Sequence, residues 1–273
     1  MLKNQTFKPL NFFFIAANSL VATGLLTKSE QTLGEWLFLI WGGITGIFLT
    51  YRFNDFIDGH PKLEFDFKEF FMIRSHQFFT FQLLFILVPF SFLFLSEFRI
   101  FVLASSGFLG FLYSVNFRIG HIPIRLKNIF LLKNALIGVC WGSLVLVGAD
   151  RYDHDIILSL FLFSTIQVLI GSSLRDFTDI KQDTIEYVRS LPVTIGESNA
   201  LVVLGLLNIL SGVISWVILG LDQWIVPMAV TILWRFFLLW KVYTANEKRY
   251  WCQKMNLLTC FIIFLGSFFI WIF

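Results

Sequence analysis

Residues 33–60 read LGEWLFLIWGGITGIFLTYRFNDFIDGH and join a long apolar run to a short cluster of polar side chains. After Glu35 no charged residue appears until Arg52, and the run is of the length and composition expected for a membrane helix. Asn54, Asp55 and Asp58 follow directly, which is an expensive place for carboxylates unless they have a function. The same pattern returns at 175–183, RDFTDIKQD, after a second apolar run.

The composition of the whole chain indicates a membrane protein. Of its 273 residues, 57% are hydrophobic and only 14% are charged, with a mean hydropathy of +0.76, whereas about a quarter of a soluble domain is charged. A formal net charge of +3 is too small to suggest a nucleic-acid partner. The three cysteines have no CxxC or histidine spacing, so we expect neither a disulfide set nor a zinc site.

Apolar runs repeat along the chain without a linker-like segment between them. Because backbone groups in hydrocarbon must be hydrogen-bonded internally, these runs predict helices. We expect an all-α, multi-pass transmembrane bundle of about nine helices, forming one domain over residues 1–273. The runs lie at about 10–26, 35–51, 77–95, 99–114, 130–148, 156–174, 200–220, 223–240 and 255–273. Gly107, Gly110, Gly138 and Gly142 are expected to let helices approach closely.

The basic residues are sorted by side in this topology. With the amino terminus in the cytoplasm, eighteen of the 21 Lys and Arg residues, Arg235 among them, fall on the inner side, and only Lys28, Arg99 and Arg151 fall outside. This is the bias expected for a correctly threaded membrane protein. It also places the polar cap loops and the acids on the cytoplasmic side, and the compact chain favours a bacterial inner membrane.

Two acid clusters stand out on that side: the first is Asn54, Asp55 and Asp58, and the second is Asp176, Asp179 and Asp183. In each, residues four apart share one face if the helix continues through them. Carboxylates brought together repel unless cations lie between them, and oxygen ligands of this kind suit Mg²⁺ bound together with substrate phosphates. The clusters therefore predict a site for a phosphorylated or diphosphorylated ligand. The alternative is that the acids only mark where each helix meets water.

Three motifs resemble those of the UbiA superfamily of intramembrane prenyltransferases. NDFID (54–58) is similar to the family's NDxxDxxxD motif, and RDFTDIKQDTIEYVRSLPVTIG (175–196) is similar to DxxDxxxDxxxGxxTLPxxxG. Between them, YSVNFRIGHIPIRLKN (113–128) is similar to the YSxPxRLK loop. The motifs stand in family order and, with the helical frame, cover most of the chain.

The resemblance implies roles for individual residues. The residues implied to be catalytic are Asp55, Asp58, Asp176, Asp179 and Asp183. Those implied to hold one Mg²⁺ for each cluster are Asn54, Asp58, Asp179 and Asp183. From the middle motif, Arg125 and Lys127 are implied to bind diphosphate oxygens, with Tyr113 nearby. Two weaker candidates for substrate contact are Asn18, within the first apolar run, and Arg175; helix–helix hydrogen bonding is the alternative for Asn18.

The motifs also depart from the family pattern. Lys62 stands where the first motif has its third acid, and we expect it to neutralise part of the diphosphate. Tyr187 replaces the glycine of the second motif, Ser190 replaces its threonine, and the proline expected soon after Tyr113 is missing.

The resemblance implies a Mg²⁺-dependent prenyltransferase that moves an isoprenoid group from a prenyl diphosphate to a lipophilic acceptor in the membrane. Three alternatives remain open. A terpene cyclase of the same superfamily would ionise the same substrate but quench the cation internally or with water. A non-enzymatic carrier or transporter of an anionic lipid would bind without chemistry, and a divergent relative would have lost activity. The oligomeric state is not predicted.

Overall fold

The computed structural model describes residues 32, 34–37, 39–43, 95–119, 122–148, 154–185, 187–220, 225–256, 258–259 and 262. The first acid cluster, Lys62 and Asn18 lie outside the described residues. Within the described part the helices are α5 (Glu97–Ser114), α6 (Leu132–Gly148), α7 (His154–Ile185), α8 (Leu191–Ile195), α9 (Glu197–Leu219) and α10 (Ile225–Thr244). A short 3₁₀ turn, η1 (Leu126–Asn128), precedes α6, and a π-helical turn, η2 (Tyr250–Met255), follows α10.

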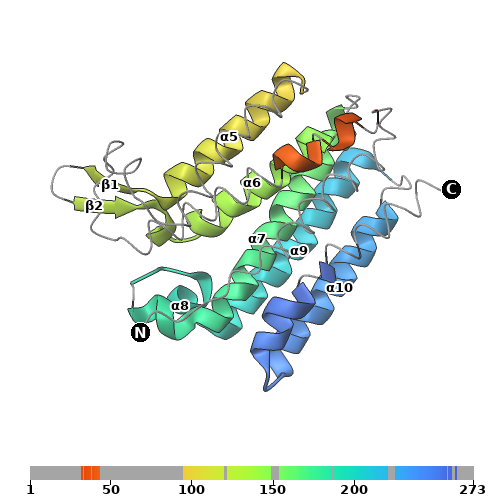
Figure 1. Cartoon of the computed structure of the whole chain (residues 1–273). Coiled ribbons are helices and arrows are strands. Elements are labelled where there is room, and N and C mark those ends of the chain that lie inside the picture. Colours follow the sequence, from red (N-terminus) through yellow and green to blue (C-terminus); the bar gives the residue numbers. More distant parts are fainter. Residues whose placement is uncertain are drawn as a thin grey trace.

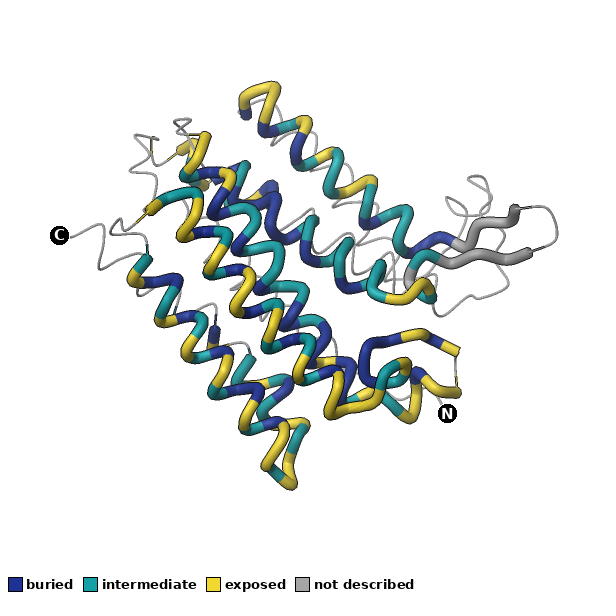
Figure 2. The backbone as a smooth tube through the Cα atoms, turned by 180° about the vertical axis from the view of Figure 1, so that it is seen from behind, coloured by how far each residue is buried: buried dark blue, intermediate teal, exposed yellow. Residues whose placement is uncertain are grey.

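The long helices pack side by side in the order α5, α6, α7, α9 and α10 (Figure 1). The short α8 packs against α7 and α9, and η2 packs against α7 and α10. Buried and exposed residues recur with the turns of each long helix, so each has an inward face and an outward face (Figure 2). The helical bundle expected from the sequence is confirmed; the count of about nine helices stays a prediction, because only part of the chain is described.

Three of the described helices, α7, α9 and α10, are long and apolar enough to cross a membrane. The structure separates the last two of these, as the apolar runs at 200–220 and 223–240 predicted. Helix α9 ends at Gly220, which has a left-handed φ of 66° and donates its N–H to the Trp216 carbonyl at 2.8 Å. Glycine adopts this conformation without the steric penalty of a side chain, so it ends the helix here.

Helix α7 extends well beyond the apolar run that predicted it. We expected a span over 156–174 with the acids in a following loop, but the helix continues to Ile185. Its 32 residues give a length of about 48 Å, against about 30 Å for the hydrocarbon core of a bilayer. No glycine or proline interrupts 175–185, and Phe177 anchors this end in the core. The second acid cluster is therefore helical and lies where α7 leaves the apolar layer.

The all-helical class is confirmed, with one short hairpin that the sequence did not predict. Strands β1 (Asn116–Ile119) and β2 (Ile122–Arg125) form an antiparallel hairpin between α5 and α6, with Asn116 opposite Arg125. The segment is rich in β-branched and aromatic residues, a composition that favours strands. Each strand has only four residues, so neither strand produces an apolar run long enough to be recognised in the sequence.

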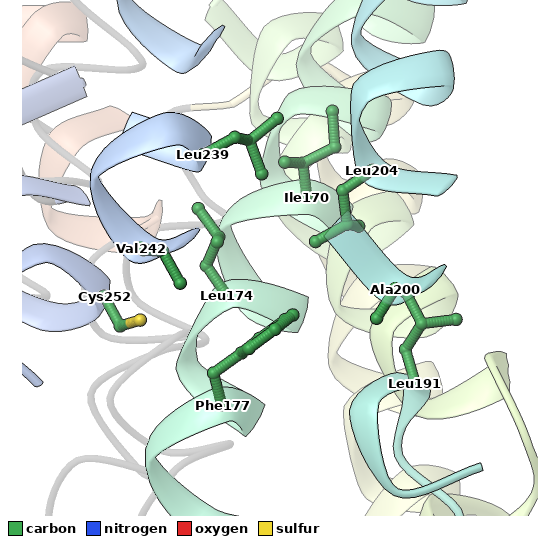
Figure 3. Packing of buried hydrophobic residues seen from close by; sticks show 9 residues of the cluster. All are labelled: Ile170, Leu174, Phe177, Leu191, Ala200, Leu204, Leu239, Val242 and Cys252. Atoms are coloured by element: carbon green, nitrogen blue, oxygen red, sulfur yellow. The ribbon is translucent and has the colours of Figure 1, made fainter. Parts of the chain in front are cut away.

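The largest buried apolar cluster lies between α7, α9 and α10 at the end of the bundle that carries the acids. It includes Leu174 and Phe177 from α7, Leu204 from α9, Val242 from α10 and Cys252 from η2 (Figure 3). Leu174, Leu204, Val242 and Cys252 are each 0% exposed. This packing fixes the rotation of α7 and hence the direction of its polar face.

The expected close approach at glycine is confirmed for Gly138 and Gly142 and not for Gly107. A Cβ added at Gly138 would lie 2.6 Å from the backbone oxygen of Thr165 on α7, whereas one added at Gly107 would meet nothing within 4 Å. We expect Gly138→Ala to lower the free energy of unfolding by about 1–3 kcal/mol, because two helices must move apart. Gly107→Ala is the matched control and should leave stability equal or slightly higher. Thermal unfolding in detergent checks both; equal melting temperatures would contradict the packing.

Candidate functional site

The second acid cluster lies on one side of the last turns of α7, and we call Asp176, Asp179 and Asp183 the acid face. The spacing that the sequence predicted to share a face is helical in the structure. The three carboxylates differ in environment: Asp176 is 2% exposed and Asp183 is 7% exposed, while Asp179 is exposed. The acid face therefore combines two buried carboxylates with one that is exposed.

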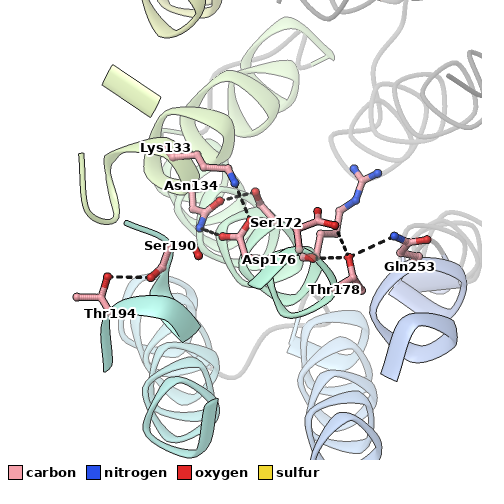
Figure 4. Close-up of polar contacts among 10 residues, drawn as sticks. Lys133, Asn134, Ser172, Asp176, Thr178, Ser190, Thr194 and Gln253 are labelled. Atoms are coloured by element: carbon pink, nitrogen blue, oxygen red, sulfur yellow. Dashed lines mark hydrogen bonds and ion pairs between the residues drawn. The ribbon is translucent and has the colours of Figure 1, made fainter. Parts of the chain in front are cut away.

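Asp176 is fully engaged by the start of α6. Lys133 Nζ lies 2.7 Å from Asp176 Oδ1, and Asn134 Nδ2 donates to Asp176 Oδ2 at 2.8 Å. Ser172 Oγ donates to Asn134 Oδ1 at 2.6 Å, which fixes the orientation of the amide (Figure 4). Both oxygens of Asp176 thus accept hydrogen bonds from α6, so this buried carboxylate is paired as burial requires.

Asp183 is the opposite case, because no described residue makes a hydrogen bond of ordinary geometry to its buried Oδ2. The hydroxyl of Ser190, which is 3% exposed at the start of α8, acts on this carboxyl and favours its charged form. A buried carboxylate oxygen without a partner is rare and costly, and it calls for an explanation such as a bound ion. Four residues earlier, Asp179 accepts a hydrogen bond from Thr178 Oγ1 at 3.1 Å through Oδ1.

These two carboxylates fit a divalent cation in their chemistry. Oxygen ligands suit Mg²⁺, which binds through one or two carboxylates and leaves positions for substrate oxygens. In the described part of the chain no group of three or more His, Cys, Asp or Glu side chains is arranged to hold a metal ion. Any cation held by Asp179 and Asp183 would therefore take its remaining ligands from outside the described residues or from a bound substrate.

The end of α7 explains the tyrosine that departs from the family pattern. Val188 N–H donates to the Asp183 carbonyl at 2.8 Å and Tyr187 N–H to the Thr184 carbonyl at 3.5 Å. These are the two bonds of a Schellman cap, in which the residue at position 187 takes a left-handed conformation that favours glycine. Tyr187 has a φ of 56° and is 87% exposed. Tyrosine in place of the family's glycine makes the left-handed backbone of the cap less favourable. It does not move the residues of the acid face.

Tyr187→Gly should raise the free energy of unfolding by up to about 1 kcal/mol, because glycine removes the strain of the left-handed backbone. The exposed phenol makes no packing that the variant would lose. Tyr187→Ala is the control, since it removes the ring but keeps the Cβ. A gain with alanine equal to that with glycine, measured by thermal unfolding, would show that strain is not the cause.

The middle motif lies between α5 and α6. Tyr113 is in the last turn of α5, Arg125 ends β2 and Lys127 is in η1, directly before the helix that carries Lys133. Since the start of α6 reaches Asp176, the chain connection brings this motif to the same end of the bundle as the acid face. Arg175 lies on the exposed side of α7, one residue before the acid face.

Sequence reasoning missed a second polar cluster, buried among α7, α9 and α10. It also counted Arg235 with the cytoplasmic basic residues, whereas Arg235 is 3% exposed in the middle of α10. Arg235 Nε donates to Gln167 Oε1 at 3.1 Å, Nη2 donates to the Gln167 backbone oxygen at 3.2 Å, and Nη1 donates to Asn256 Oδ1. Gln167 Nε2 in turn donates to Asn208 Oδ1 at 2.8 Å. The signal in the sequence was a charge within an apolar run.

This cluster ties η2 to α7. Asn256 Nδ2 donates to the Gly171 backbone oxygen at 2.8 Å, and a Cβ at Gly171 would lie 3.1 Å from Asn256 Oδ1. One turn earlier in η2, Gln253 Nε2 donates to Thr178 Oγ1 at 3.4 Å (Figure 4). The polar contacts therefore reach from the middle of the bundle to the residue next to Asp179.

Comparisons with known proteins agree with this architecture. A family model described as the UbiA prenyltransferase family matches residues 72–272. A structure reported for digeranylgeranylglyceryl phosphate synthase in membranes is 18% identical, covering 94% of this chain and 93% of that chain, with a TM-score of 0.64. An apo UbiA homolog from Aeropyrum pernix K1 is 15% identical, covering 96% and 98%, with a TM-score of 0.67.

A UbiA homolog from Archaeoglobus fulgidus bound to GPP and Mg²⁺ is 12% identical, covering 97% of this chain and 98% of that chain, with a TM-score of 0.68. Comparison with curated proteins gave no match. At these identities the solved structures establish the fold, and the family model, which spans most of the chain, establishes the family. The chain is an integral membrane protein that belongs to the UbiA prenyltransferase family.

Proposed function

We propose that this protein transfers an isoprenoid group from a prenyl diphosphate to a lipophilic acceptor in a Mg²⁺-dependent reaction. The observation that carries the proposal is the buried Oδ2 of Asp183 on the acid face of α7, which accepts no hydrogen bond of ordinary geometry from the described residues. The Archaeoglobus fulgidus homolog of the same fold was solved with GPP and Mg²⁺, which supports the choice of donor and metal. Family membership supports the reaction class.

Asp179 and Asp183 are the described residues proposed to hold Mg²⁺, together with Asn54 and Asp58 of the first acid cluster. When bound, Mg²⁺ would neutralise charge on the departing diphosphate. The residues of the chain supply the rest of the site: Asp183 supplies a buried carboxylate, and Lys133, paired with Asp176, supplies a positive charge that acts on it. Arg125, Lys127, Tyr113 and Lys62 are proposed to contact the diphosphate, with Asp55 and Asp176 in supporting roles.

Ionisation of an allylic diphosphate leaves a carbocation that water would destroy. The acid face lies where α7 leaves the apolar layer, so the diphosphate can stay at the polar end while the isoprenoid chain extends among apolar side chains. A lipophilic acceptor reaches such a site from the membrane. The distribution of basic residues supports an acid face that opens to the cytoplasm.

Tyr187, one of the departures from the family pattern, acts in the helix cap and is exposed, so it gives no support to a terpene cyclase. Membership of a prenyltransferase family favours transfer to an acceptor over a cyclase or a carrier. Transfer to an acceptor is therefore the function we propose.

Product analysis tests the proposal. Purified protein in detergent is incubated with Mg²⁺ and radiolabelled geranyl, farnesyl or geranylgeranyl diphosphate, with and without a membrane lipid extract. A labelled product that forms only with the extract identifies a transferase. A labelled hydrocarbon or alcohol that forms without the extract identifies a cyclase, and bound but unchanged donor identifies a carrier.

A further inference from the structure

We propose that Lys133 is a fixed cation that binds diphosphate oxygens, and that Asp176 is a positioning residue for Lys133 and not a ligand of the metal. The inference rests on the proposed function, because it assigns residues to the diphosphate part of that site. It revises the role that the family resemblance implies for Asp176.

The bonding of Asp176 leaves it poorly suited to a metal. Its Oδ1 faces the Lys133 ammonium at 2.7 Å and its Oδ2 accepts from Asn134 at 2.8 Å. A divalent cation at this carboxylate would have to displace the amide or approach the ammonium, and like charges at such distances repel strongly away from water. Asn134 is itself 2% exposed and held by Ser172, so it has little freedom to turn away.

Lys133 has the properties of a ligand-binding residue. Its side chain is 21% exposed, in contrast to 3% for its partner Asp176. An ammonium has three N–H donors, and in the described part of the chain only one of them has a partner, Asp176 Oδ1. The charges of Asp179 and Asp183 also act on this ammonium. Lys133 is thus anchored at one donor and close to the carboxylates proposed to hold Mg²⁺.

Charge counting supports the same assignment. Pairing with Lys133 neutralises Asp176, so the negative charge of the acid face remains on Asp179 and Asp183. A single divalent cation balances these two carboxylates. Asp183, whose buried Oδ2 accepts no hydrogen bond of ordinary geometry from the described residues, then lies on the metal side of the site, and Lys133 lies on the diphosphate side.

Two variants separate this role from a structural one. Lys133→Met alone leaves the buried Asp176 without its counter-charge and can unfold the protein, so the test uses Lys133→Met combined with Asp176→Asn, which removes both charges together. Lys241→Met is the matched control: Lys241 lies on α10 with its Nζ 4.7 Å from the centroid of the Trp240 ring, and within the described part of the chain its contacts are with aromatic rings. The probes are radiolabelled inorganic diphosphate and Mn²⁺, whose binding is followed by equilibrium dialysis and electron paramagnetic resonance.

The double variant should bind inorganic diphosphate roughly ten- to a hundredfold more weakly than the wild type, since one charged hydrogen bond is lost. Its affinity for Mn²⁺ should stay unchanged, and Lys241→Met should match the wild type with both probes. Unchanged diphosphate binding in the double variant would overturn the role of Lys133. Weakened Mn²⁺ binding would overturn the role of Asp176. A wild type that binds inorganic diphosphate yet consumes no prenyl diphosphate would count against the proposed function alone.

Discussion

Asp183→Asn is expected to slow diphosphate release from a prenyl diphosphate by about a hundredfold or more, the size of effect seen when a group that stabilises developing charge is removed. Asparagine keeps the shape of the side chain but loses the negative charge that holds a cation. Because Asp183 is buried and its Oδ2 accepts no hydrogen bond of ordinary geometry from the described residues, the charge costs stability in the metal-free protein. The variant should therefore unfold at the same temperature as the wild type, or higher, in metal-free buffer.

Mg²⁺ distinguishes this loss from a folding defect. The wild type should become more stable as Mg²⁺ is added with inorganic diphosphate, since a ligand that binds only the folded state stabilises it. Asp183→Asn should show little or none of this gain. Asp155→Asn is the control, because Asp155 is an exposed carboxylate at the opposite end of the same helix. Full activity of Asp183→Asn, or an equal loss in Asp155→Asn, would show that the acid face is not the reactive centre.

Arg235→Met is expected to lower the free energy of unfolding by about 2–4 kcal/mol, as three hydrogen bonds from a buried charged group are lost. Methionine fills much of the volume but leaves Gln167 Oε1 and Asn256 Oδ1 without their donor. Arg235→Lys should recover little, because an ammonium cannot reproduce the planar arrangement of donors that reaches both side chains. Thermal and denaturant unfolding in detergent measure the effect.

Lys241→Met is the matched control for Arg235, since both residues lie on α10. Lys241 lies over aromatic rings near the end of the helix, and loss of this contact should cost about 1 kcal/mol or less. Arg235→Met should also lower the activity measured at a temperature where it is folded, because η2 contacts α7 next to Asp179. Equal stability of the Arg235→Met and Lys241→Met variants would show that the buried cluster does not hold the bundle together.

The sequence predicted those features that depend on local pattern. Apolar runs located α5, α6, α9 and α10, and the start of α7, to within a few residues, because helices in lipid must be apolar where they cross it. The spacing of Asp176, Asp179 and Asp183 predicted a shared helical face, which α7 provides. Family motifs then supplied the chemistry that spacing alone left open.

Features that depend on packing between distant residues were not predictable in this way. The contact between Lys133 and Asp176 joins positions 43 apart and exists because α6 and α7 cross closely at Gly138. Arg235 was assigned to the cytoplasmic side by its charge alone, although Gln167 and Asn256 satisfy it inside the bundle. Tyr187 looked like a change at the site until the left-handed backbone showed that it belongs to a helix cap.

The most direct test of the central claim is the release of inorganic diphosphate by purified wild-type protein. It is measured with each labelled prenyl diphosphate and lipid extract, once with Mg²⁺ and once with a chelator. The account predicts release from at least one donor that requires Mg²⁺ and falls about a hundredfold or more in Asp183→Asn. Release that is equal with the chelator, or no release from any donor, would contradict a Mg²⁺-dependent prenyltransferase centred on the acid face of α7.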